Sequence, residues 1–329
     1  MSGLRHEYGI LVLVRVSIVI PCYRSEQSLR PLVEGIFSAV VEPSTAALIS
    51  EFEVVLVVDG SPDAAASVAR ALAAEHPEVR AVELRRNYGQ HNALLAGISR
   101  ARYEVVVTMD DDLQHRPDQI HALLGPLARG EVDLVYGVAI EEEHGLIRSA
   151  ASQTVKRGLA FAGVPNAQDV SAFRAFSTSL REGFTLSEDP YVSLDVMLSW
   201  TTTSIARVLV DMDERTIGTS GYSLRALFRH AMNMVTGYSN LPLRLVAWLG
   251  GVCASFGAVL GGVVIWKFAA GDTTVAGFTT IASMVAVFSG AQMLSLGIIG
   301  EYIGRLHTRS TGKPTFVVRS DSAVPDRET

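Results

Sequence analysis

Two long stretches near the end of the chain are almost free of charge, and they limit what the chain can fold into. Between Leu243 and Phe268 the only charged residues are Arg244 and Lys267, which lie at the two ends, and residues 276–300 carry no charge. Each stretch exceeds the roughly 20 residues that a helix needs to cross a bilayer core. We therefore expect two transmembrane helices; the alternative is a buried helix pair in a soluble protein.

Basic residues flank these two predicted spans on the same side. They lie before the first span and after the second, at Arg225, Arg229 and Arg244 and at Arg305, Arg309 and Lys313. The positive-inside rule places both flanks, and with them the large N-terminal part, in the cytoplasm. The N-terminus does not resemble a signal peptide, because Arg15 interrupts its apolar run and no small-residue cleavage site follows. The pattern predicts a multi-pass protein of the cell (inner) membrane.

The same patterns divide the chain into four parts. We expect a cytoplasmic domain over residues 1–221, an amphipathic juxtamembrane helix over 222–242, two transmembrane helices within 243–301 and a cytoplasmic tail over 302–329. Residues 146–162 and 222–238 carry apolar residues at helical spacing together with basic residues, which is typical of helices at a membrane interface. Packing on the sheet is the alternative for both. Residues 313–319 are expected to form a short strand, and the polar last ten residues to be disordered.

Apolar β-branched runs alternate with helical segments in the first part of the chain. Strands are predicted at residues 16–20, 52–58, 79–84, 104–109 and 133–138, and helices at 25–41, 62–74, 90–102 and 117–129. This alternation predicts an α/β domain with a mostly parallel sheet that is covered on both faces. The 28 basic and 34 acidic residues argue against a nucleic-acid-binding protein. Two cysteines, Cys22 and Cys253, make a disulfide framework implausible.

A triplet of carboxylates, Asp110 to Asp112, follows directly on the predicted strand 104–109. In open α/β sheets ligands bind just outside the carboxyl ends of the strands. Side chains at i and i+2 of an extended segment point the same way, so Asp110, Asp112 and Gln114 are expected to share one face. Magnesium or manganese held by one or two carboxylates usually also holds substrate phosphates. The alternative is that one aspartate caps the next helix and the others are solvated.

Two other kinds of nucleotide site are not expected. No G-x-G-x-x-G sequence follows a predicted strand, which argues against a dinucleotide-binding site. The only Gly-Lys pair, Gly312-Lys313, lacks the glycine five residues earlier that a phosphate-binding loop requires. The phosphates of a bound nucleotide would therefore be neutralised mainly by a metal ion.

Ordered motifs extend this pattern over nearly the whole chain. They are Ile20-Pro21-Cys22-Tyr23, Val58-Asp59-Gly60-Ser61-Pro62-Asp63, Arg86-Asn87-Tyr88-Gly89, the segment Asp110–Gln114, and residues 169–174, 239–244 and 300–305. With these motifs the chain resembles the family 2 glycosyltransferases of the GT-A fold, and it is similar to dolichyl- and polyprenyl-phosphate sugar synthases. The resemblance implies a nucleotide-sugar-binding α/β domain, then amphipathic interface helices and two transmembrane helices.

The resemblance assigns roles on the donor side of the site. Pro21, Tyr23 and Asp59 would line the nucleoside pocket, where Asp59 accepts a hydrogen bond from a base N–H. Capping of the following helix is the alternative for Asp59. Glu26 would stand in for an acidic residue that the family places nearby. The divalent metal, Mg²⁺ or Mn²⁺, would be held against the donor diphosphate by Asp110, Asp112 and Gln114, whereas Asp111 receives no role.

The resemblance also assigns roles on the acceptor side. Arg148 and Ser152 are one helical turn apart, so they face the same way, and the family binds the acceptor phosphate with an Arg and a Ser at this spacing. Contact with lipid head groups or a solvated face is the alternative for Arg148. Arg174 belongs to a motif that the family uses near the active site, with a structural salt bridge as the alternative.

Three positions depart from the family pattern. Val58 stands where many relatives have a second aspartate, which weakens any inference about the base of the donor. Ala139 stands where relatives often carry an arginine, so one contact to the acceptor phosphate is missing or supplied elsewhere. Gly221 replaces a lysine in a segment that is expected to form a flexible loop over the site.

Together these observations predict a metal-dependent transfer of a sugar from a UDP, GDP or dTDP donor to polyprenyl phosphate at the cytoplasmic membrane surface, and the resemblance implies inversion at the anomeric carbon. A transferase or processive synthase that acts on a sugar hydroxyl is the first alternative. A non-catalytic membrane scaffold of the same fold is the second. The spacings Gly257-x-x-x-Gly261 and Gly300-x-x-x-Gly304 let helices approach closely, which fits a homo-oligomer and equally fits packing between the two spans.

Overall fold

The computed structural model describes residues 13–140, 171–183, 193–213, 241–271 and 277–324. The chain divides into two units, of which the larger contains Met1–Ala160, Pro165–Ser223 and Lys313–Thr329, and the smaller Phe161–Val164 and Leu224–Gly312. The expected amphipathic segments 146–162 and 222–238 lie outside the described residues.

An eight-stranded sheet forms the centre of the larger unit, in the order β7-β5-β6-β4-β1-β2-β3-β8. Neighbouring pairs are parallel except those made by β6 and β8, which run antiparallel to their neighbours. The mostly parallel sheet predicted from the sequence is therefore confirmed. The strands are β1 Val14–Cys22, β2 Ile49–Val58, β3 Val79–Leu84, β4 Val105–Thr108, β5 Leu134–Ala139, β6 Arg174–Ser177, β7 Ile205–Val210 and β8 Val318–Asp321.

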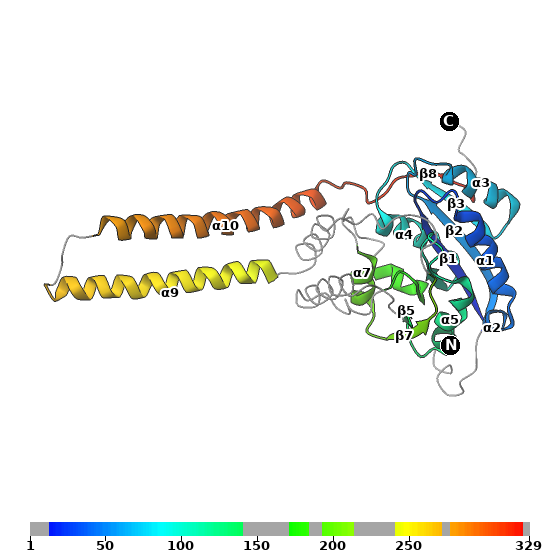
Figure 1. Ribbon diagram of the computed structural model, residues 1–329, viewed down its shortest axis with the longest axis horizontal. Helices are drawn as coiled ribbons and strands as arrows, with labels where there is room; N and C mark the ends of the chain where they lie inside the picture. Colours follow the sequence, from blue (N-terminus) through cyan, green and yellow to red (C-terminus); the bar gives the residue numbers. More distant parts are fainter. Residues whose placement is uncertain (1–12, 141–170, 184–192, 214–240, 272–276, 325–329) are drawn as a thin grey trace. The chain divides into compact units, whose positions relative to one another are not determined.

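Helices cover both faces of this sheet, because alternate side chains of a buried strand point to opposite faces. In β1, Ile18 and Ile20 belong to the cluster that packs against α1, α3 and α5, whereas Val19 belongs to the cluster under α4 and α7 (Figure 1). The buried residues of the parallel strands are predominantly apolar on both faces, as expected for such strands. The helices are α1 Leu29–Val41, α2 Pro43–Ala46, α3 Ala65–Glu75, α4 Gln90–Ile98, α5 Ile120–Ala128 and α7 Leu194–Thr201, with short 3₁₀ turns at Pro117–Gln119 and Thr178–Gly183.

The structure corrects several boundaries that the sequence predicted. Strand β1 continues through Pro21 to Cys22, because it pairs with β2 up to Val58. Helix α1 begins at Leu29 rather than at residue 25. The elements α2, β6, α7 and β7 were not predicted.

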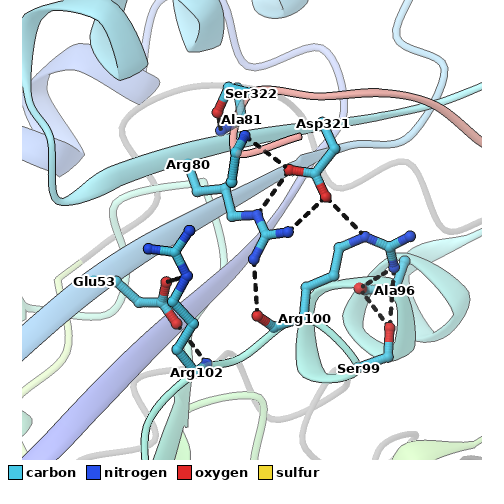
Figure 2. A network of polar contacts seen from close by, with 10 residues as sticks. Glu53, Arg80, Ala81, Ala96, Ser99, Arg100, Arg102, Asp321 and Ser322 are labelled. Atoms are coloured by element: carbon cyan, nitrogen blue, oxygen red, sulfur yellow. Dashed lines mark hydrogen bonds and ion pairs between the residues drawn. The ribbon is translucent and has the colours of Figure 1, made fainter. Parts of the chain in front are cut away.

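The expected strand near the C-terminus forms, but further along the chain. Strand β8 includes Val318 and Arg319 of the expected range 313–319 and continues through Ser320 and Asp321, which were expected to be disordered; it pairs with β3 at the edge of the sheet. Figure 2 shows its anchor, in which the Asp321 carboxylate accepts hydrogen bonds from Arg80 and Arg100. The hydroxyl of Ser322 accepts a further hydrogen bond from the Ala81 N–H at 3.0 Å.

A helical hairpin forms the described part of the smaller unit. Helix α9 spans Leu241–Ala269 and α10 spans Phe278–Ser310, so both predicted spans are helical (Figure 1). Among the described residues one helix is long and apolar enough to cross a membrane, over Pro242–Val263 in α9. By this criterion, one of the two predicted transmembrane helices is confirmed. Large apolar side chains are exposed along α9, among them Trp248, Val252, Phe256 and Trp266.

We expect Gly97→Ala to destabilise the larger unit. A Cβ at Gly97 in α4 would lie 2.3 Å from Val19 Cγ1 and 2.9 Å from Val57 Cγ2, both of which are fully buried. Overpacking of this kind typically costs about 1–3 kcal/mol, measurable as a lower melting temperature. The control is Gly125→Ala in α5, whose Cβ would lie 3.4 Å from a flexible Arg129 side chain. An equal effect of both substitutions would contradict the expectation.

Asp321→Asn should lower the melting temperature by a few degrees near neutral pH. Burial raises the pKa of Asp321, but the hydrogen bonds from Arg80 and the Ala323 N–H and the charges of Arg80 and Arg100 together outweigh burial and hold it below 3.8. The native carboxylate therefore binds its proton less tightly than the unfolded one. Its stabilisation is present above the unfolded pKa and is lost as the pH falls through the folded pKa. Thermal unfolding from about pH 7 to about pH 3 should show the variant and wild type converging; a constant gap would refute this.

Candidate active site

A cleft opens at the carboxyl ends of β1, β2 and β4. It has a volume of about 340 Å³ and is lined by Pro21, Cys22, Tyr23, Asp59, Asn87, Gly89, Gln90, Asp110, Asp111 and Asp112. The strand order reverses here, since β2 and β3 lie on one side of β1 and β4 on the other. Open α/β sheets bind ligands at such switch points. Four of the predicted donor-side residues, Pro21, Tyr23, Asp59 and Asp110, and the predicted metal ligand Asp112 are thus brought together.

Asp110 is held by hydrogen bonds to its side chain and to its backbone. Its Oδ1 accepts a hydrogen bond of 2.7 Å from Gln90 Nε2, and its backbone N–H donates to His115 Nδ1 at 3.0 Å. The His115 ring is buried and stacks on Phe173 with ring centroids 5.2 Å apart. Burial lowers the pKa of His115 to about 4, so the ring is neutral near pH 7 and its Nδ1 can accept.

Asp111 turns toward β1 and joins two loops. Its Oδ2 accepts a hydrogen bond of 3.0 Å from the Tyr23 N–H. Burial raises the pKa of this carboxyl to about 6, against the lowering effect of the Tyr23 hydrogen bond. The residue that received no role in the sequence analysis therefore ties the Asp110–Asp112 loop to the loop after β1.

Asp112 and Gln114 do not continue an extended strand. Strand β4 ends at Thr108, and Leu113 has a left-handed backbone with a φ of 63°. The Asp112 Oδ1 accepts a hydrogen bond of 3.2 Å from the Gln114 N–H, which closes a tight turn. The assumption of alternating side chains from Asp110 to Gln114 is therefore wrong, and Gln114 is not among the described residues that line the cleft.

The cleft offers oxygen ligands for a hard cation. Asp110 and Asp112 both line it, and carboxylates are the ligands that magnesium and manganese prefer. Within the described ranges, no group of three or more His, Cys, Asp or Glu side chains is arranged to hold a metal ion. This donor set fits an ion held by one or two carboxylates and completed by substrate phosphates.

Asp59 is fixed by the loop that follows β3. Its two oxygens accept hydrogen bonds of 2.7 Å from the N–H groups of Tyr88 and Gly89. Burial raises the pKa of Asp59, while these bonds lower it. The alternative of a helix cap is wrong, because α3 begins at Ala65 and it is Asp63 whose Oδ1 accepts the Ala65 N–H.

The other predicted site residues lie elsewhere. Glu26 accepts a hydrogen bond of 3.0 Å from the Ala64 N–H and lines a separate hollow of about 460 Å³ with Arg24, Gln27, Ser28, Pro62 and Asp63. Arg174 is buried, donates to Thr108 Oγ1 at 3.0 Å and pairs with Asp195. This placement favours the structural salt bridge over the predicted catalytic role. Arg148, Ser152 and Gly221 lie outside the described residues.

Sequence reasoning missed Gln90 and His115, which orient Asp110. Both follow directly on quoted motifs, Gln90 after Gly89 and His115 after Gln114. This adjacency was the available signal, since neither residue type marks a site by itself.

Comparison with known proteins agrees with this geometry. Residues 17–181 match the family described as glycosyl transferase family 2, and residues 241–306 match the GtrB C-terminal hairpin. The chain belongs to glycosyl transferase family 2. It is therefore a glycosyltransferase, and the predicted relationship to polyprenyl-phosphate sugar synthases is confirmed.

Curated relatives resemble the chain over most of its length. An undecaprenyl-phosphate 4-deoxy-4-formamido-L-arabinose transferase of Pectobacterium carotovorum is 31% identical over 92% of this chain and 92% of its own. The transferase of the same name from Pseudomonas fluorescens is 32% identical over 94% of this chain and 92% of its own. These matches include both the α/β unit and the hairpin.

Solved structures support the fold. Glucosyl-3-phosphoglycerate synthase from Mycobacterium tuberculosis, in complex with Mn²⁺, UDP and phosphoglyceric acid, superposes with a TM-score of 0.51. It is 20% identical and covers 68% of this chain and 76% of its own. At this identity the similarity shows that the larger unit has a GT-A-like α/β fold.

Gln90→Ala should weaken the reaction through Asp110. Loss of a partner that orients a metal-binding carboxylate typically costs about 10- to 100-fold in metal affinity or activity. We expect the Mn²⁺ concentration for half-maximal activity to rise and kcat/KM to fall within that range. Gln119→Ala is the matched control, because Gln119 does not line the cleft and its side-chain oxygen accepts a long 3.4 Å hydrogen bond from the Asp211 N–H. Unchanged metal dependence of Gln90→Ala would show that Gln90 does not orient Asp110 for a metal.

Proposed function

We propose that this glycosyltransferase moves a sugar from a nucleoside diphosphate donor to a polyprenyl phosphate at the cytoplasmic membrane surface, in a metal-dependent, inverting reaction. The observation that carries the proposal is the similarity to undecaprenyl-phosphate sugar transferases over more than nine-tenths of the chain, from the carboxylate cleft through the hairpin. The 4-deoxy-4-formamido-L-arabinose in the names of those relatives makes amino-sugar donors the first class to test.

The donor would lie across the cleft with its base toward Tyr23 and Asp59. Tyr23 is 42% exposed and borders the cleft together with Asp59, so its ring can stack on a base. The Arg24 guanidinium lies 5.6 Å from the centre of the same ring. Both Asp59 oxygens already accept a backbone N–H, but each carboxylate oxygen has a second lone pair for a base N–H. The base can be that of UDP, GDP or dTDP.

The diphosphate would lie toward Asp110 and Asp112. These two residues, with Gln114 as a further predicted ligand, would hold Mg²⁺ or Mn²⁺ there, and the bound ion would stabilise the charge that develops on the leaving diphosphate. Gln90 and His115 hold Asp110 in place through hydrogen bonds, and neither of them adds a negative charge to the site. The carboxylates therefore serve as ligands in this proposal.

The chemistry of the acceptor removes the need for a strong general base. A phosphate monoester has a second pKa of about 6 and is largely ionised near neutral pH. Its oxygen can attack the anomeric carbon directly, whereas a sugar hydroxyl must lose a proton as it attacks. Arg148 and Ser152 remain the proposed ligands of the acceptor phosphate. In catalysis Arg174 would act indirectly, through its hydrogen bond to Thr108 at the end of β4.

The layout proposed for the chain follows from a lipid acceptor. Residues 1–221 would form the cytoplasmic catalytic domain, 222–242 a juxtamembrane helix at the interface, and α9 and α10 two spans that return the chain to the cytoplasm. The exposed apolar side chains of α9 fit contact with lipid. An enzyme anchored in this way meets its acceptor in two dimensions.

The test is a membrane assay with a panel of UDP-, GDP- and dTDP-sugars and undecaprenyl phosphate, read by mass spectrometry. The expected product is a lipid-linked monosaccharide that disappears when EDTA is added and returns with Mn²⁺. Undiminished product in EDTA would contradict the metal assignment, and formation of a polymer or a glycosylated hydroxyl acceptor would contradict the proposed acceptor. Absence of lipid product with every donor would refute the proposal as a whole.

Asp112→Asn should abolish most of this activity, because it removes a charged ligand without changing the size of the side chain. We expect a loss of about 10²-fold or more in kcat, as for removal of a group that stabilises developing charge. Asp118→Asn is the control, since Asp118 pairs with the exposed Arg116 outside the cleft. Equal activity of Asp112→Asn and wild type would contradict the assignment, provided that both insert and fold normally.

A further inference from the structure

Strand β8 is anchored to the sheet by one buried carboxylate. Asp321 accepts hydrogen bonds of 2.7 Å from both Nε and Nη2 of Arg80 and one of 3.1 Å from Nε of Arg100 (Figure 2). The side chains of Asp321 and Arg80 are only 10% and 13% exposed. A bidentate pair of this kind fixes geometry as well as adding stability. It therefore sets the register of β8 on β3.

The other end of β8 lies against the loop that leaves β3. Val318 is opposite Leu84, and the Arg85 N–H donates to the Val317 carbonyl at 2.9 Å, one residue beyond the paired strands. Phe316 packs against the same apolar cluster as Tyr88, and the Arg100 guanidinium lies 5.8 Å from the centre of its ring. Because β8 runs antiparallel to β3, its end opposite the Asp321 anchor lies beside the loop that leaves β3 and borders the donor cleft.

The loop that leaves β3, Arg85–Gly89, binds the Asp59 carboxylate. Its Tyr88 and Gly89 N–H groups occupy both Asp59 oxygens. Gly60 packs directly against the backbone of this loop, because a Cβ there would lie 2.2 Å from the Arg86 carbonyl carbon and 2.4 Å from the Asn87 nitrogen. A shift of Arg85 or Arg86 would therefore be passed on to Asp59, while Asn87 and Gly89 line the cleft themselves.

We propose that β8, which follows the hairpin helix α10 after the short segment Thr311–Val317, positions the nucleoside side of the donor cleft, with Asp321 as its anchoring residue. The inference rests on the proposed nucleotide-sugar donor. Asp321 does not line the cleft, so it is a positioning residue that acts through β3 and the Arg85–Gly89 loop. The alternative is that β8 only protects the edge of the sheet, as added edge strands do.

The two readings differ in kinetics. If β8 positions the loop, Asp321→Asn should raise the Kd for the nucleoside diphosphate and the KM for the donor by about 2- to 30-fold, the range for residues that act indirectly. The kcat and the KM for undecaprenyl phosphate should stay close to wild type. If β8 only protects the edge, the variant should lose stability and leave the donor KM unchanged.

Glu53→Gln is the matched control. Glu53 is also a buried, ion-paired acid of the same sheet, 4% exposed, and accepts hydrogen bonds of 2.7 Å from Ser17 Oγ and the Arg102 N–H. In the part of the chain that the structure describes, Glu53 has no hydrogen bond to β8 or to the Arg85–Gly89 loop. Phe316→Ala is the second test variant, because it removes a ring that packs against the same apolar cluster as Tyr88 and leaves both Arg80–Asp321 hydrogen bonds in place.

The experiment uses the full chain in detergent, below the melting temperature of every variant. Binding of UDP, GDP and dTDP is measured by calorimetry, and amide exchange by mass spectrometry. Weaker nucleotide binding in Asp321→Asn and Phe316→Ala, with faster exchange at residues 85–89 and neither effect in Glu53→Gln, would support the proposal.

Unchanged binding and exchange in both tail variants would overturn it, as would equal weakening in Glu53→Gln. A wild-type protein that binds none of the three nucleotides would instead refute the proposed function, so the two failures are distinguishable.

Discussion

The site depends on keeping four carboxylates close together in a cleft where they repel one another and lose hydration. Asp59, Asp110, Asp111 and Asp112 all border the same space, and burial raises the pKa of both Asp59 and Asp111. Each of the four accepts an N–H hydrogen bond, from the backbone of Tyr88 and Gly89, the side chain of Gln90, and the backbone of Tyr23 and Gln114 respectively. Neutral donors stabilise the charges without cancelling them, which leaves the cleft suited to a cation and a diphosphate.

The sheet topology explains why these groups can meet. Parallel strands bring the carboxyl ends of β1, β2 and β4 to one edge, and the order reverses at β1. The alternation of apolar runs and helices was enough to predict this part of the fold. Strand β6 was not predicted, and only the first half of β8 was, because charged residues interrupt the apolar pattern of these short strands. Arg174 at the start of β6 and Asp321 at the end of β8 are charged, and only their buried partners explain that.

The roles of Pro21, Tyr23, Glu26 and Asp59 came from the family resemblance. Asp110 and Asp112 were also marked by their place after a predicted strand, since side-chain type and strand end are both visible in a sequence. The orientation of these side chains is not. Every residue except proline carries a backbone N–H, so nothing in the sequence marks Tyr88 and Gly89 as the partners of Asp59. The left-handed turn at Leu113 likewise breaks the alternation that placed Gln114 beside Asp110 and Asp112.

The position of β8 also has a consequence for how the protein is made. The outer edge of β3 pairs with residues that are synthesised only after both helices of the hairpin. The catalytic sheet therefore cannot be completed until the hairpin has left the ribosome, and until then β3 is an open edge on which other chains could add. Completion of the sheet follows synthesis of the hairpin, so a chain that stops after α10 would lack β8 and leave the outer edge of β3 unpaired.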